Sequence, residues 1–144
     1  MSDSYLDVVT LVPPVSAEDV KEKLSMIPLL QLTAEAEKAG LGLKVLELNH
    51  EEWKVKQQIE ERKAEALEEL RERKKEDKSL TEAVITSLVA NDVAVRKLQV
   101  ELEGIQYLAA KKEVSMKFRS GRITTLKVLH RTLLALSGVP VAED

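Results

Sequence analysis

The sequence predicts an all-α protein, in which a long antiparallel helical hairpin with a short N-terminal helix and arm assembles into a helical oligomer. Of its 144 residues, 33% are charged and only 3% are aromatic, a composition typical of long helices that pack along narrow seams. Residues 43–78 contain no Gly or Pro, and their apolar side chains recur at helical spacing. A short chain of this kind buries little surface alone, which favours association with further copies.

Residues 1–15 are expected to form an N-terminal arm. The β-branched stretch 5–12 is also compatible with an edge strand, which the pair Pro13-Pro14 would end. Chain ends are usually loosely held, which favours the arm over the strand.

Ser16 is expected to begin the helical part of the chain. It is followed by an acid three residues later, a capping pattern that predicts a short helix ending near Met26. Pro28 suits the first position of a next helix, because that position has no amide partner to lose. Gly40 and Gly42 lower helix propensity, so we expect a kink or break before the first long helix.

The first long helix is predicted over about residues 43–78. Its last part, residues 60–78, holds eight acidic and seven basic side chains, which is typical of a solvated helix surface with side-chain ion pairs. Polar Glu52 and Arg62 fill gaps in the apolar seam. The seam itself consists of Val45, Leu48, Val55, Ile59, Ala66 and Leu70.

A turn and a second long helix follow. Ser79-Leu80-Thr81-Glu82 has the pattern of a capping box, and Asn91-Asp92 is a second possible start, so we expect a long helix over about residues 91–137. It ends before Gly138, which leaves residues 138–144 as a tail. The chain is therefore predicted to form a single helical domain over residues 16–137. The second seam consists of Val95, Leu98, Leu102, Ile105, Ala109, Met116, Leu126, Leu129, Leu133 and Leu136.

The sequence contains no pattern for catalysis or for a metal or cofactor site. There is no cysteine, and the two histidines, His50 and His130, lie eighty residues apart. Acidic pairs on a solvated helix lack the sheltered pocket that acid–base catalysis needs. We expect a binding protein that is not an enzyme, with no catalytic residue, no metal and no cofactor.

Neither a secretory signal nor a membrane span is predicted. Residues 1–14 lack a basic start and a long apolar core. No stretch reaches the roughly 18 apolar residues that a membrane span needs. The expected location is the cytoplasm, with no membrane partner.

Positive charge gathers late in the chain. Residues 105–137 contain seven basic side chains and one acidic one, within a chain of net charge −3. A local excess of this kind favours binding to a phosphate backbone, with an affinity that falls as salt rises. On a helical wheel Lys111, Arg119 and Arg122 share one quadrant, with Lys112 close by. The alternative is that these bases pair with acids of the first long helix or of a neighbouring subunit.

A second basic cluster ends the first long helix and consists of Arg71, Arg73, Lys74, Lys75 and Lys78. The helix dipole favours bases at this position without any ligand, but an outward-facing turn would present them to DNA.

The aromatic residues are isolated from one another in sequence, and we expect each to plug a seam rather than stack on a base. Binding to DNA would then be led by phosphates and indifferent to sequence. These aromatic residues are Trp53, Tyr107 and Phe118.

Two stretches of the predicted hairpin resemble a known family. The first is Leu70-Arg71-Glu72-Arg73, late in the first long helix. The second runs from Val89-Ala90-Asn91-Asp92 through Lys97-Leu98, Leu102 and Tyr107 into Lys117-Phe118-Arg119-Ser120-Gly121-Arg122 and Leu126-Lys127. Over about residues 45–135 the chain is similar to the UvsY family of phage recombination mediator proteins, which shares the chain size, a long charged helix, a turn, a second long helix and a Leu-basic-x-basic element. The acid between the two arginines and the Pro-containing arm depart from the family pattern.

The resemblance implies a closed ring of several copies that binds single-stranded DNA and helps load a RecA-like recombinase onto DNA covered by single-strand-binding protein. The main alternative is a helical scaffold or adaptor protein that acts only through protein–protein contacts, and a weaker one is a regulatory subunit of an enzyme. The DNA-binding residues would be Arg71, Arg73, Lys74, Lys75, Lys111, Lys112, Arg119 and Arg122. The self-assembly residues would be Leu98, Leu102, Ile105, Phe118, Leu126, Leu129 and Leu133.

Overall fold

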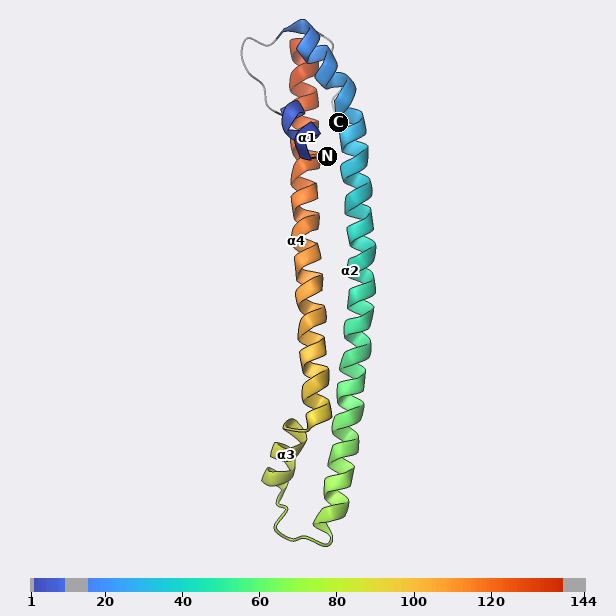
Figure 1. Cartoon of the computed structure of the whole chain (residues 1–144), viewed down its shortest axis with the longest axis vertical. Coiled ribbons are helices and arrows are strands. Elements are labelled where there is room, and N and C mark those ends of the chain that lie inside the picture. The colour runs from blue at the N-terminus through green and yellow to red at the C-terminus, as the bar shows by residue number, and fades with distance from the viewer. Residues whose placement is uncertain (1, 10–15, 139–144) are drawn as a thin grey trace. The chain divides into compact units, whose positions relative to one another are not determined.

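The computed structural model describes residues 2–9 and 16–138, which form four helices (Figure 1). The two long helices, of 58 and 44 residues, pack antiparallel, and a short helix lies in the connection between them. The predicted all-α helical hairpin is therefore confirmed. The helices are α1, Ser2–Val9; α2, Ala17–Lys74; α3, Glu82–Ala90; and α4, Val93–Leu136.

The first long helix starts earlier than predicted. The Ser16 hydroxyl accepts a hydrogen bond of 3.1 Å from the backbone amide three residues later, which confirms the predicted cap. The helix that follows does not end near Met26, and it does not break at Gly40 or Gly42. The expected end near Met26 and the expected break are wrong, because α2 continues as one helix to Lys74. The alternative of a kink at the two glycines stays a prediction.

The continuity of α2 through Pro28 follows from its buried seam. Val20, Ile27 and Ala34 of α2 are buried on either side of the proline. A break in the helix at Pro28 would move some of these side chains out of their buried positions. Proline inside a helix costs about 3 kcal/mol and glycine about 1 kcal/mol, whereas each buried aliphatic side chain contributes about 1.5–3 kcal/mol. Pro28 is itself exposed, so its ring meets solvent rather than the seam.

The N-terminal residues fold as a helix rather than as an arm or an edge strand. Val8 of α1 is fully buried and joins a core with residues of α2 and α4, while Tyr5 is half-buried against it. This burial orders the segment, so the predicted strand and the loose arm are wrong for residues 2–9. Residues 10–15, the rest of the predicted arm, lie outside the described residues.

The other helix ends lie within a few residues of the predicted ones. α2 ends at Lys74 rather than at residue 78, and Thr81 rather than Ser79 caps α3 by accepting a hydrogen bond from an amide three residues later. Asp92 caps α4 in the same way at 3.1 Å, as predicted. Gly138 follows α4 with a φ of 79°, the left-handed conformation that stops a helix. The predicted tail beyond it, residues 139–144, lies outside the described part of the chain.

The chain contains two compact units. The terminal unit comprises residues 1–43 and 113–144, and the central unit comprises residues 44–112. Both predicted seams contribute to the central core, whereas only the second one contributes to the terminal core, whose other members were not predicted. The terminal core consists of Val8, Val20, Ile27, Leu126, Leu129 and Leu133. The central core consists of Val55, Ile59, Val95 and Ile105, with Leu48, Leu98 and Leu102 packed against it.

Candidate nucleic-acid interface

The basic cluster at the end of α2 belongs to the central unit. Arg71 and Arg73 are exposed, whereas Leu70 beside them is half-buried. The Leu-basic-x-basic element therefore turns its leucine toward the protein and both arginines toward solvent. Among the described residues, neither arginine forms an ion pair, so both guanidinium groups are available to an anion.

The two lysines that follow are already paired with acids. Lys74 is half-buried, and its ammonium lies 3.1 Å from a Glu82 carboxylate oxygen. The hydrogen bond from Lys74 is the main reason why the pKa of the Glu82 carboxyl lies below its ordinary value. Lys75 is exposed and lies 3.0 Å from Glu72. Exposed pairs of this kind are weak, so Lys75 is able to exchange its partner for a phosphate.

The predicted bases of α4 differ in exposure. In the central unit Lys111 is exposed, while Lys112 is half-buried. In the terminal unit Arg119 and Arg122 are both half-buried. The structure therefore does not place these four side chains on one exposed basic face.

Arg119 pairs with an acid of α2. Its Nε lies 2.8 Å from Glu37 Oε2, although this nitrogen makes no hydrogen bond of good geometry. The two side chains are 29% and 35% exposed, so the contact is an ion pair at the edge of the seam. For Arg119 the alternative of pairing within the hairpin is confirmed.

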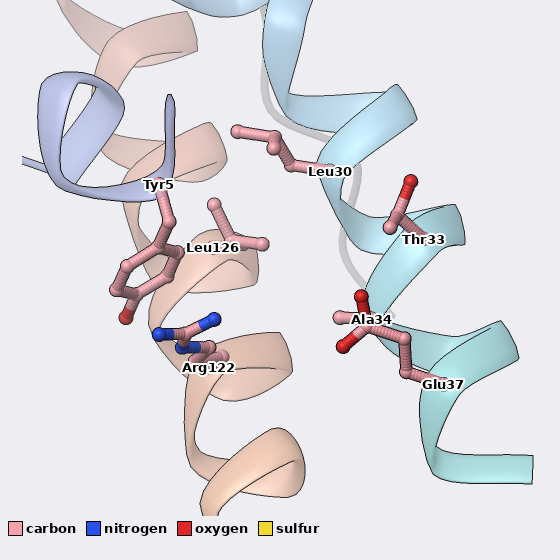
Figure 2. Close-up of a pocket in the computed structure, with 7 residues that line it drawn as sticks. All are labelled: Tyr5, Leu30, Thr33, Ala34, Glu37, Arg122 and Leu126. Atoms are coloured by element: carbon pink, nitrogen blue, oxygen red, sulfur yellow. The ribbon is translucent and has the colours of Figure 1, made fainter. Parts of the chain in front are cut away.

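Arg122 is held between two aromatic rings. Its guanidinium carbon lies 4.7 Å from the centroid of the Tyr5 ring and 4.7 Å from the centroid of the Phe118 ring, and such cation–π contacts are attractive. Figure 2 shows the guanidinium group between Tyr5 of α1 and Glu37 of α2. Its Nε has no hydrogen-bond partner among the described residues. Arg122 therefore fastens α1 to α4 and contributes little to an exposed basic surface.

A small cavity lies beside this arginine (Figure 2). It has a volume of about 20 Å³ and is lined by Tyr5, Leu30, Thr33, Ala34, Glu37, Arg122 and Leu126. A water molecule needs at least roughly 10–15 Å³ measured in this way, so the cavity accommodates about one water. It is far too small for a nucleotide.

The predicted self-assembly residues mostly pack within the chain. Ile105 is buried in the central core, with Leu98 and Leu102 against it. Leu126, Leu129 and Leu133 are buried in the terminal core. Of the seven predicted residues only Phe118, at 60% exposed, leaves most of its surface for another molecule.

The aromatic side chains do not plug the seams. Trp53 and Tyr107 are 58% and 67% exposed, and Phe118 is exposed as well. The expectation that each fills a seam within the chain is therefore wrong. The seams are closed instead by the smaller Val, Ile, Leu and Ala side chains, because antiparallel helices that pack closely leave little room for a ring.

The central unit contains two polar contacts that were not predicted from the sequence. Arg62 donates two hydrogen bonds of 3.0 Å to Asp92, the residue that caps α4. These hydrogen bonds are the main reason why the pKa of Asp92 lies below its ordinary value. They are also the main reason why the pKa of Arg62 lies above its ordinary value. Glu52 similarly accepts a hydrogen bond of 3.1 Å from Gln106, which is the main cause of its lowered pKa. The sequence signal was the position of Glu52 and Arg62 in gaps of an apolar seam, where a polar side chain needs a partner.

Residues 2–9 and 16–138 contain no group of three or more His, Asp or Glu side chains that could hold a metal ion. In the same part of the chain no helix is long and apolar enough to cross a membrane. No protein-family model, no curated protein and no solved structure matches the chain.

Proposed function

We propose that this chain is a recombination mediator without catalytic activity of its own. It binds single-stranded DNA as a homo-oligomer and helps load a RecA-like recombinase onto DNA covered by single-strand-binding protein. The observation that carries the DNA-binding part is the exposure of Arg71 and Arg73, neither of which forms an ion pair with the described residues. Glu82, which pairs with Lys74, is the acid whose pKa the charge of Arg71 also lowers. Guanidinium groups bind phosphate oxygens through paired hydrogen bonds. The specific role of mediator is supported by the UvsY-like sequence of residues 45–135.

The proposed DNA contacts are narrower than those expected from the sequence. The exposed Lys75 and Lys111 would add phosphate contacts to those of the two arginines. Lys112, Arg119 and Arg122 are half-buried and are left out of the proposed interface. Contacts to phosphate carry no sequence information, so the protein would bind strands of any sequence.

The proposed mechanism depends on several copies acting together. One chain offers few phosphate contacts, and each is weakened by salt. A homo-oligomer, in the form of the ring that the resemblance implies, combines these contacts through a high effective concentration. Multivalent binding of this kind displaces the single-strand-binding protein step by step and presents the DNA strand to the recombinase in the cytoplasm.

The test is fluorescence anisotropy of a labelled single-stranded oligonucleotide at low and moderate salt. We expect the double variant Arg71→Glu, Arg73→Glu to lose about tenfold or more in affinity. The slope of log affinity against log salt should fall by about 1.4, because each phosphate contact on a single strand contributes about 0.7. Absence of binding by a folded wild-type sample at low salt would refute the proposal.

The matched control reverses two other exposed bases of α2, Lys44 and Lys54. The double variant Lys44→Glu, Lys54→Glu changes the net charge by the same amount but leaves the arginines in place. It should keep most of the affinity and of the salt slope. Equal losses in the two variants would show that the net charge, and not the end of α2, governs binding.

A helical scaffold or adaptor protein is the second candidate, and exposed apolar side chains on α4 favour it. In the central unit Val93, Val100 and Tyr107 are exposed and follow one another at seven-residue spacing, so they lie on one side of the helix. Apolar surface of this kind is typical of contacts between proteins. The same anisotropy measurement separates the candidates, because an adaptor gives flat curves at both salt concentrations.

A further inference from the structure

We propose that two copies of this chain pair through the outward side of α2, with the two helices antiparallel about a two-fold axis at Ala36. The surface involved, here called the α2 patch, lies entirely in the terminal unit. This inference goes beyond the proposed function and does not depend on DNA binding. The α2 patch consists of Leu29, Leu32, Ala36, Ala39, Gly40 and Leu43.

The α2 patch faces away from the core of its unit. Its three leucines are 68%, 64% and 64% exposed in chain order, and its two alanines and its glycine are exposed as well. The buried residues of the same stretch, Ile27 and Ala34, fall on the opposite side of the helix at 3.6 residues per turn. This part of α2 therefore has two apolar sides, of which residues 2–9 and 16–138 cover only one.

The outward side of this stretch is also poor in charge. Residues 28–43 contain three charged side chains, Glu35, Glu37 and Lys38. Glu37 pairs with Arg119 and Lys38 is half-buried, so Glu35 is the one that is exposed. The water-facing side of a helix is normally polar, and a side as apolar as the α2 patch is expected to be covered by a partner.

The order of residues in the α2 patch identifies that partner as a second copy. Leu29 and Leu43 each lie seven residues from Ala36, and Leu32 and Gly40 each lie four residues from it. Antiparallel pairing about Ala36 therefore places Leu29 beside Leu43 of the second copy and Leu32 beside its Gly40. A two-fold contact requires a surface that is complementary to itself in this way, whereas a different partner does not.

The sizes of the side chains fit this pairing. Small residues at the centre let two helix axes approach to about 8 Å. Apart from its neighbours along the helix, no atom of the described residues lies within 4 Å of the position that a Cβ on Gly40 would take, so nothing packed against it requires glycine there. In the pair, the missing side chain of Gly40 leaves room for the Leu32 side chain of the second copy.

The two-fold pairing limits the size of the assembly that the α2 patch alone builds. A two-fold contact closes after two copies, so a larger ring of this chain needs another surface in addition to the α2 patch.

The first test is the mass of the full chain in solution, measured by sedimentation equilibrium. Ala36→Glu places two carboxylates against each other on the two-fold axis, so it should halve the mass of the wild-type assembly. The control Ala64→Glu makes the same change at an exposed alanine of α2 four heptads further along, and should leave the mass unchanged. A monomeric wild-type protein, or an Ala36→Glu variant of unchanged mass, would overturn the proposal.

The second test is disulfide crosslinking, which is clean because the chain has no cysteine. Ala36→Cys should form an interchain disulfide on mild oxidation. Leu29→Cys alone should not, since its two copies lie about 21 Å apart in the antiparallel pair and a disulfide spans at most about 7 Å between Cα atoms. Mixing Leu29→Cys with Leu43→Cys should restore crosslinking. Crosslinking of Leu29→Cys by itself, or failure of Ala36→Cys to crosslink, would overturn the antiparallel pairing.

Discussion

The terminal and central units are both built from α2 and α4, yet they hold the arginines in their seams differently. In the central unit Arg62 meets Asp92 through two hydrogen bonds of 3.0 Å, so both charges are satisfied. In the terminal unit Arg119 pairs with Glu37, whereas Arg122 lies against the rings of Tyr5 and Phe118, and its Nε has no hydrogen-bond partner among the described residues. The comparison shows that the same helical pattern accommodates a seam whose arginine is paired with an acid and a seam that contains more arginines than paired acids.

The two units also differ in how tightly their cores are packed. Four of the largest fully buried side chains, Ile27, Leu126, Leu133 and Val8, belong to the terminal unit, whereas Ile85 and Val95 belong to the central unit. The terminal unit has the additional cover of α1, which contributes Val8. We infer that the terminal unit depends more on apolar packing and the central unit more on hydrogen bonds between its helices.

The largest expected effect is the loss of packing in the terminal core. Leu133→Ala should lower the free energy of unfolding by about 4 kcal/mol, and Ile105→Ala in the central core by about 2 kcal/mol, because a less enclosed site relaxes more easily around a cavity. Urea unfolding followed by circular dichroism measures both values. The exposed Leu136 is the control, and its change to Ala should stay within about 0.5 kcal/mol. Equal losses at Leu133 and Ile105 would contradict the difference between the units.

A smaller effect is expected from removing the acid of the terminal seam. Glu37→Gln keeps the size of the side chain but removes the carboxylate that pairs with Arg119. We expect a loss of about 1 kcal/mol in the free energy of unfolding, the upper range for a partly exposed ion pair. Adding Arg119→Met to this variant should recover part of the loss, since it removes the charge that was left unpaired. No recovery in the double variant would show that Arg119 is not the partner that matters.

The smallest expected effect is a change in how acid destabilises the central unit. The pKa of Asp92 lies below its ordinary value of 3.8, chiefly because of the hydrogen bonds from Arg62. A carboxyl whose pKa is lowered by folding adds stability that is fully present above its unfolded pKa and is lost as pH falls through its folded pKa. Asp92→Asn should therefore flatten the fall of the thermal midpoint below about pH 4, where this carboxyl titrates.

A suitable control for this pH dependence is Asp77→Asn. The pKa of Asp77 is also lowered, by hydrogen bonds from Ser79 within the same turn, so this variant changes a local contact and not one between helices. Thermal midpoints are compared from neutral pH downwards. An unchanged acid profile in Asp92→Asn would show that its bond with Arg62 does not stabilise the folded chain.

The cores and most helix ends were predictable from the sequence because they depend on local spacing. Seam residues of the two long helices form the central core and the α4 half of the terminal core, whereas Val8, Val20 and Ile27 were not among the predicted seam residues and Leu136, which was, is exposed. Ser16, Asp92 and Gly138 cap or stop helices as their residue types predict. The continuity of α2 through Pro28 was not predictable in this way. It results from burial against α4 that outweighs the local cost of proline and glycine.

The candidate site was less predictable, because charge was taken as a sign of exposure. Arg119 and Arg122 stand at positions close to the seam of α4, where long side chains extend along apolar surface with their charged ends at its edge. Tyr5, which contacts Arg122, and Glu37, which pairs with Arg119, lie far from these arginines in the sequence, so no local sequence pattern predicts these contacts. The charged run over residues 60–78 was predicted only as a largely solvated surface; Arg71 and Arg73 are exposed, whereas Ala66 and Leu70 of the same run lie in the seam.

The antiparallel course of α2 and α4 also sets an order of folding. Arg62 and Asp92 are 30 residues apart in sequence, and Glu52 and Gln106 are 54 residues apart, whereas the Glu37–Arg119 pair of the terminal unit closes a far longer stretch of chain. Longer loops cost more entropy to close, and contacts distant in sequence form more slowly. On the ribosome, α1 and the first part of α2 therefore emerge well before the residues of α4 that cover them, and their apolar side chains remain open to chaperones until those residues of α4 have been made.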